Sequence, residues 1–93
     1  MTKEDRETIE EIRVRVRSGE RILVKNKKNE KVYVLTAIGY IGTKEENEEL
    51  KKNGKAYDST CFDTYFFYTN TEKNGKPFGK TFTYRYEQLD FNV

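Results

Sequence analysis

The chain has 93 residues, 34% hydrophobic and 37% charged, which is enough apolar material for one domain with a modest core. The 18 basic and 16 acidic residues leave a net charge of +2, which excludes a strong attraction of the whole molecule to nucleic acid or to an anionic membrane. With no histidine and one cysteine, Cys61, the chain cannot build a Cys/His zinc site or a Cys–His nucleophile pair. We therefore expect a single domain over residues 1–93 that is not an enzyme and holds no metal or cofactor.

Residues 2–17 predict an amphipathic helix, within an N-terminal helical region over residues 1–18. Thr2 and Asp5 have the spacing of a capping box, and Gly19 is a natural stop. Apolar residues recur at helical spacing and form a thin stripe, made of Ile9, Ile12 and Val16. The alternation of apolar residues and arginines over residues 12–17 also fits a strand. We prefer the helix because the preceding glutamates favour it.

Residues 20–93 predict an antiparallel barrel that begins with two strands. The first strand covers residues 21–25, and a polar turn separates it from a longer, nearly continuous apolar strand over residues 31–41. Such continuity indicates burial on both faces or a bend, for which Gly39 and Gly42 are candidate positions. Residues 43–55 are rich in glutamate and lysine with one large apolar residue, Leu50, and we expect a surface insertion there.

Residues 60–86 predict an aromatic hairpin, which is the strongest structural signal in the chain. Asn74 and Gly75 accept the positive φ angles of a two-residue type I′ turn. This turn would pair Lys73 with Lys76, Phe67 with Phe82, Tyr65 with Tyr84, and Asp63 with Tyr86. One face of the hairpin then carries a ladder of large rings, and such cross-strand pairs stabilise small sheets.

The last residues, 86–93, carry three apolar anchors and fit one helical turn followed by a short final strand. The fold class is therefore α+β and mainly β, with an N-terminal helix before five antiparallel strands. We expect a small, strongly bent five-stranded antiparallel barrel of the SH3-like or Sm-like type, because closing the sheet removes its exposed edges. This expectation is architectural, and fold alone does not define function.

The two faces of the hairpin suggest different roles. We expect the face with Tyr65, Phe67, Phe82, Tyr84 and Tyr86 to form the core, although such rings can also stack bases or a proline-rich peptide. The other face carries more rings than a polar partner strand can cover. If it meets solvent, it forms a docking surface for a partner protein, made of Phe62, Phe66, Tyr68 and Arg85.

Basic residues suggest an alternative function, which is nucleic-acid binding. If the two hairpin tips lie near one another, they could bracket a phosphate backbone while tyrosines stack bases. The residues of this alternative are Arg13, Arg15, Arg17, Lys27, Lys28, Lys73 and Lys76. We also expect that residues 22–24 or the final strand could remain an unpaired edge and form a homodimer with a second copy.

The leading functional hypothesis is a non-enzymatic binding module that acts through a protein–protein surface. No stretch is long and apolar enough for a membrane span, and the first residues lack the layout of a secretion signal. A single cysteine favours a reducing cytoplasm for so small a domain. The abundance of Lys, Glu, Asn and Tyr resembles accessory proteins of phages and mobile elements of low-GC bacteria, some of which modulate or inhibit host machinery.

Overall fold

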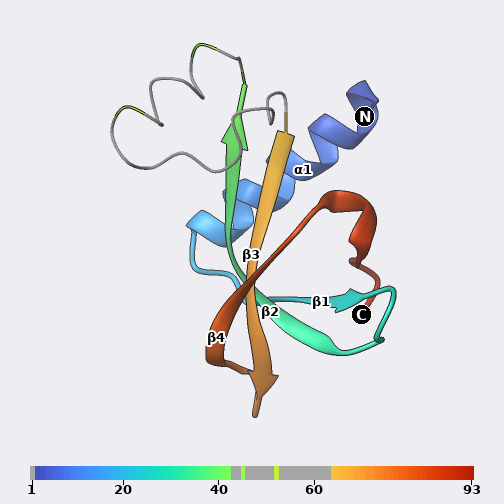
Figure 1. Ribbon diagram of the computed structural model, residues 1–93, viewed down its shortest axis with the longest axis vertical. Helices are drawn as coiled ribbons and strands as arrows, with labels where there is room; N and C mark the ends of the chain where they lie inside the picture. Colours follow the sequence, from blue (N-terminus) through green and yellow to red (C-terminus); the bar gives the residue numbers. More distant parts are fainter. Residues whose placement is uncertain (1, 43–44, 46–51, 53–63) are drawn as a thin grey trace.

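The computed structural model describes residues 2–42, 45, 52 and 64–93. Over these residues the chain forms one N-terminal helix and a five-stranded antiparallel sheet (Figure 1). The elements are α1 (Lys3–Arg17), β1 (Ile22–Asn26), β2 (Val32–Ile41), β3 (Thr64–Lys73), β4 (Lys76–Tyr84), the 3₁₀ turn η1 (Tyr86–Gln88) and β5 (Leu89–Asp90). The predicted α+β, mainly β class is therefore confirmed.

Helix α1 begins with the predicted capping box. The backbone N–H of Asp5 donates to the Thr2 hydroxyl at 3.1 Å, and the Asp5 carboxylate accepts the Thr2 N–H at 3.2 Å. Gly19 follows the helix at a φ of 89°, a conformation that favours glycine. A strand over residues 12–17 would place Val14 on the same face as its apolar neighbours. In the helix Ile12 is buried while Val14 is 63% exposed, which shows the helical period.

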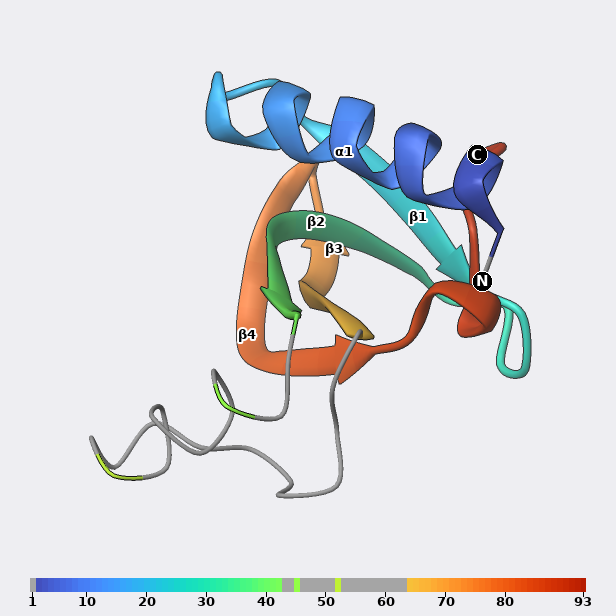
Figure 2. The same ribbon diagram turned by 90° about the horizontal axis from the view of Figure 1, so that it is seen from above.

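The strand order of the sheet is β4-β3-β2-β1-β5. The chain forms a meander from β1 to β4, and the final strand then returns to pair with the first, as Lys25 with Asp90 and Asn26 with Leu89. Figure 2 shows that the sheet curls strongly, with α1 lying across one side of it. Within the described part of the chain, β4 and β5 are the two edge strands and the sheet is not closed.

Strand β2 bends at a bulge, and this explains its nearly continuous apolar sequence. The register with β3 shifts between Leu35 and Ala37, so core-facing residues change from odd positions before the bulge to even positions after it. The intervening Thr36 donates its hydroxyl to the Tyr68 carbonyl at 3.0 Å. Gly39 instead lies beneath an aromatic ring, because a Cβ there would be 3.2 Å from Tyr68 Cε2. The bulge, rather than a glycine, shifts the register.

The β3–β4 hairpin has the predicted turn but a different register further out. Asn74 and Gly75 have φ angles of 55° and 76°, and Lys73 pairs with Lys76. A register shift between Asn70 and Thr71 then inserts two extra residues in β4, including Gly79 at a φ of 76°. The predicted pairs Phe67–Phe82 and Tyr65–Tyr84 are wrong: the observed pairs are Phe67 with Tyr84 and Thr69 with Phe82. A shift of two residues preserves the side-chain faces, since side chains alternate with a period of two.

The core lies between α1 and the concave face of the sheet. Phe67 is fully buried, and its ring centroid lies 6.0 Å from that of Tyr86 and 5.7 Å from that of Phe91. The prediction that the ring ladder forms the core is confirmed, because Tyr65 is also buried and Phe82 and Tyr84 pack against the cluster. The buried cluster consists of Ile9, Ile12, Ile22, Val24, Tyr33, Leu35, Ile38, Tyr65, Phe67 and Leu89.

The predicted insertion at residues 43–55 lies almost entirely outside the described residues. Only Glu45 and Lys52 of this stretch are described, and both side chains are exposed. Phe62, Cys61 and Asp63 also lie outside the described residues. The start of the predicted hairpin and the expected pair of Asp63 with Tyr86 therefore cannot be compared with the structure.

Candidate binding surfaces

One ring of the predicted aromatic docking surface, that of Phe66, is buried beneath an arginine. Phe66 is only 5% exposed, and the Arg85 guanidinium carbon lies 4.5 Å from the centre of its ring. This cation–π contact holds the Arg85 guanidinium against the Phe66 ring. Tyr68 is half-buried against Gly39, and Phe62 lies outside the described residues. The structure thus brings Phe66 and Arg85 together, but it leaves little of the Phe66 ring exposed for a partner.

The arginines of α1 differ in their roles. Arg13 Nε donates to the Ile38 carbonyl at 3.1 Å, and its Nη1 lies 3.2 Å from Glu10 Oε1. This half-buried side chain therefore ties the helix to β2. Arg15 forms an ion pair with Glu20, and Arg17 is exposed. Of these three predicted nucleic-acid residues, Arg17 is thus the most available to a ligand.

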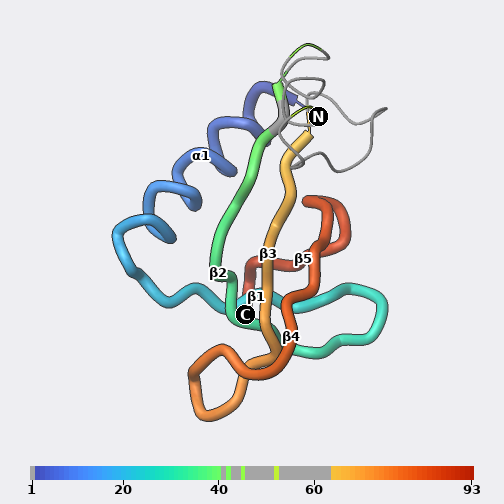
Figure 3. Tube along the Cα trace, turned by 60° about the vertical axis from the view of Figure 1, so that its left-hand side comes forward, coloured from blue at the N-terminus to red at the C-terminus, as the bar shows by residue number. Residues whose placement is uncertain are grey.

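The two basic hairpin tips lie far apart. Arg21 Nη1 donates to the Gly75 carbonyl at 2.8 Å, which places the β3–β4 tip beside the residue that precedes β1. Lys27 and Lys28 follow the other end of β1, whose five residues span about 16 Å. Figure 3 shows the two turns projecting in different directions. The two tips therefore lie at opposite ends of β1 rather than side by side, and a phosphate backbone would have to span that length to contact both.

The β3–β4 tip instead meets the end of α1. An open groove of about 330 Å³ lies between them, with apolar side chains from Val16, Val34 and Pro77 and basic ones from Arg21 and Lys76. We call the surface around this groove the basic end. Arg21, Lys76 and Glu20 line the groove, Arg15 forms an ion pair with Glu20, and Glu72 accepts the Gly75 N–H at the hairpin tip. Because three basic side chains adjoin two carboxylates here, the basic end carries an excess positive charge.

Sequence reasoning missed two residues of this region. Nothing in the sequence predicts the bond from Arg21 to the Gly75 carbonyl, which holds the helix end and the hairpin tip together. Phe78 is 55% exposed, and the Lys73 ammonium lies 4.5 Å from its ring centre. The one sequence signal for this exposure is that Phe78 lies close to the turn, at the end of the hairpin that extends away from the core.

A hydrogen-bonded network fixes the opposite end of β1. The buried Asn26 amide donates to the Tyr84 hydroxyl, which donates to the Tyr33 oxygen. Asn29 Nδ2 also donates to the Tyr33 oxygen at 3.3 Å. Burial, followed by the hydrogen bond to Tyr33, raises the pKa of Tyr84 to about 12. The hydrogen bond from Tyr84 lowers the pKa of Tyr33, against the effect of burial. The β1–β2 turn is thereby joined to the end of β4.

The described residues offer no metal-binding cluster, since no three His, Cys, Asp or Glu side chains converge among them. The helices of the described segments are all too short or too polar to cross a membrane. Fold and surfaces together define a small α+β domain with one basic end and one polar, tyrosine-lined end. The chain matches no known protein family, no curated protein and no solved structure.

Proposed function

We propose that the protein is a small non-enzymatic binding module that acts through a protein–protein surface, and that the basic end is this surface. The observation that carries the proposal is the Arg21–Gly75 hydrogen bond, which holds two basic segments on either side of a partly apolar groove. An acidic, amphipathic segment of a partner protein would match both the charge and the apolar floor of this groove. A module of this kind could modulate or inhibit host machinery as an accessory protein of a phage or mobile element.

The packing of Phe66 favours the basic end over the aromatic face as the protein surface. A docking patch needs apolar area that solvent can reach, whereas Arg85 lies over the Phe66 ring. The groove at the basic end keeps apolar walls together with unburied charge, which is the combination of an interface core and its rim.

Affinity capture from a lysate of the native host tests this proposal. The lysate is divided into a nuclease-treated half and an untreated half, and the bait is compared with the charge-reversed variant Lys76→Glu. Capture of an acidic protein that survives nuclease and is lost with Lys76→Glu supports the proposal. The matched control is Lys3→Glu, which makes the same charge change at an exposed position in the first turn of α1. Equal capture by both variants would show that the basic end is not the surface.

Nucleic-acid binding is the second candidate, and the exposed Phe78 favours it. Its ring lies beneath Lys73 in a hairpin that also carries Lys76, an arrangement that can stack a base beside a phosphate contact. Fluorescence anisotropy with single- and double-stranded DNA and RNA distinguishes the candidates. Phosphate-driven binding falls steeply with added salt, whereas a protein interface with an apolar centre changes little.

We further propose that the curled sheet belongs to the SH3-like or Sm-like barrel type. The strand order, with β5 returning to β1 after a 3₁₀ turn, supports this type, as does the helix before β1. Hydrogen exchange provides a test: the Lys27 amide, which donates to the Gln88 carbonyl where β5 returns to β1, should be protected, and rapid exchange there would contradict this type.

A further inference from the structure

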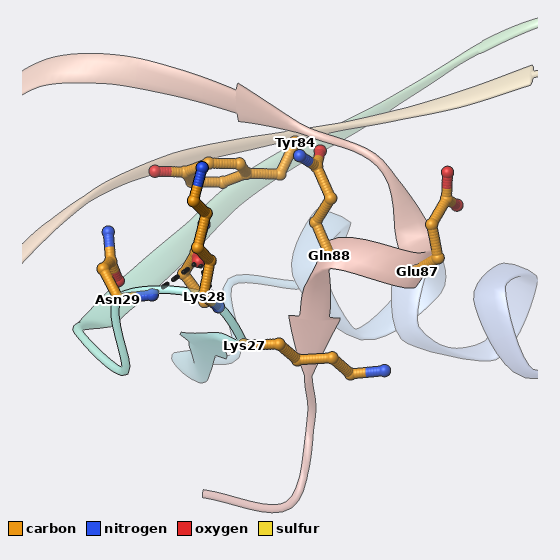
Figure 4. A pocket seen from close by; sticks show the side chains of 7 residues that line it. Lys27, Lys28, Asn29, Tyr84, Glu87 and Gln88 are labelled. Carbon is orange, nitrogen blue, oxygen red and sulfur yellow. Dashed lines mark hydrogen bonds between the residues drawn. The ribbon is translucent and has the colours of Figure 1, made fainter.

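A second cavity lies at the end of the molecule opposite the basic end. It measures about 550 Å³, within the range of cavities that hold small molecules. Its walls come from the β1–β2 turn, the end of β4 and η1, and Figure 4 shows them from close by. The lining residues are Asn26, Lys27, Lys28, Asn29, Tyr84, Glu87 and Gln88.

The amide side chains around this cavity have their oxygens directed at backbone N–H groups. Asn26 Oδ1 accepts the N–H groups of Lys28 at 2.8 Å and Asn29 at 3.2 Å. Asn29 Oδ1 accepts the Lys31 N–H at 2.8 Å, and Gln88 Oε1 accepts that of Arg85 at 2.8 Å. These bonds fix the amide orientations. The Asn26 NH₂ group already donates to Tyr84 and that of Asn29 to Tyr33, so the Gln88 NH₂ group and one further hydrogen on each asparagine are left for a ligand.

Hydrogen-bond donors therefore dominate the cavity. The Gln88 NH₂ group lies beside Tyr84, and the exposed ammonium group of Lys28 adds a positive charge, whereas that of Lys27 points away from Lys28 (Figure 4). Glu87 is the one acidic side chain in the lining, and its carboxylate lies on the far side of the cavity from Asn29 (Figure 4). A wall rich in N–H donors and positive charge complements an anion with several acceptor oxygens.

The cavity is also held rigid before any ligand arrives. Tyr84 is fixed by hydrogen bonds with Asn26 and Tyr33, and the Lys27 N–H donates to the Gln88 carbonyl at 3.0 Å. The turn and η1 therefore keep their separation, and the backbone walls of the cavity need no rearrangement to receive a ligand. The Tyr84 ring forms one wall, which suits a flat group attached to the anion.

We propose that this cavity binds a small phosphate ester of nucleotide size, with its phosphate on Lys28 and the Gln88 NH₂ group and its flat ring beside Tyr84. At about 30 Å³ for each water-sized group, the five heavy atoms of inorganic phosphate would fill only part of this open pocket of about 550 Å³. The site lies at the other end of β1 from the basic end, so it does not rest on the proposed protein partner.

Titration of the ¹⁵N-labelled full chain with adenosine monophosphate, followed by NMR, tests the proposal. Saturable shifts confined to the β1–β2 turn and to residues 84–88 are expected. Ribose 5-phosphate and inorganic phosphate should shift the same amides with lower affinity, and adenosine should leave them unchanged. Adenosine binding as tightly as its monophosphate would overturn the argument from donors and charge. The absence of saturable shifts with all three phosphates would overturn the site itself.

Two variants and one control separate this site from general electrostatic attraction. Lys28→Ala removes one ammonium group, and Gln88→Glu keeps the oxygen that accepts the Arg85 N–H while replacing the NH₂ donor. Each should weaken binding about tenfold, the effect of losing one charge-assisted hydrogen bond. Lys3→Ala removes the same charge at an exposed position in the first turn of α1 and should leave the affinity unchanged. Equal weakening by Lys3→Ala would show that the anion is attracted by net charge alone.

Discussion

Replacing Tyr65 by phenylalanine is expected to change how stability depends on alkaline pH. The Tyr65 side chain is 5% exposed, and its hydroxyl donates to Glu10 Oε1 at 2.9 Å. Burial, followed by the hydrogen bond to Glu10, raises the pKa of Tyr65 from 10.0 to about 12. Deprotonation of the folded protein at this position would place a second negative charge beside Glu10, on a ring that is itself buried.

The direction of the effect follows from which state binds the proton more tightly. Below pH 10 the hydroxyl is protonated in both states, and its contribution to stability is fully present. Between pH 10 and about 12 the unfolded chain releases this proton while the folded protein retains it, so the free energy of unfolding falls. A raised pKa of about two units corresponds to a loss of about 2 to 3 kcal/mol across this window.

Urea unfolding of the wild type and of Tyr65→Phe, measured at neutral pH and at steps between pH 10 and 12, provides the assay. At neutral pH the variant should lose about 1 kcal/mol with the hydrogen bond. Through the alkaline window the free energy of unfolding of the variant should fall less steeply than that of the wild type. The difference between the two slopes should reach up to about 1.4 kcal/mol per pH unit. Tyr84 is less suitable for this test, because the lowered pKa of its partner Tyr33 acts in the opposite direction.

Glu10→Gln tests the assigned cause. This variant removes the charge but keeps an acceptor for the Tyr65 hydroxyl, so most of the steep alkaline loss should remain if burial is the main cause. Parallel pH profiles for the wild type and Tyr65→Phe would refute the reasoning, since Tyr65 would then ionise alike in both states.

Three further substitutions test the packing, the hairpin tip and the β1–β2 turn. Phe67→Ala should cost about 3 to 5 kcal/mol by urea unfolding, because the ring is fully buried, whereas Val14→Ala should change stability by less than about 0.5 kcal/mol; similar costs would contradict the assigned core. Gly75→Ala should cost about 1 to 2 kcal/mol, since φ is 76° and the new Cβ would lie 2.5 Å from Arg21 Nη1; an unchanged thermal midpoint would contradict this contact. Asn26→Ala should cost about 2 kcal/mol and speed amide exchange in the turn, because its side chain is buried and bonds to two backbone N–H groups; unchanged exchange at Lys28 would show that the turn does not depend on it.

Local signals in the sequence predicted most of the elements. The Thr2–Asp5 box and Gly19 are complete within a few residues, and so is the Asn74–Gly75 turn. The face of each hairpin residue was also predictable, because alternation survives a register shift of two. The shift itself was not predictable, since Gly79 gave no sign that two extra residues would be accommodated in β4.

The surfaces depended on contacts between segments distant in sequence. Whether Phe66 meets solvent depends on Arg85, and whether two basic tips meet depends on the bend of the whole sheet. No local pattern encodes such distances, because each results from the summed twist and bulges of several strands. The amino-acid sequence by itself therefore determined where the helix and the hairpin turn form and which side chains face inward. Only the tertiary structure decided which charges and rings share a surface, because the curl of the sheet sets those neighbours.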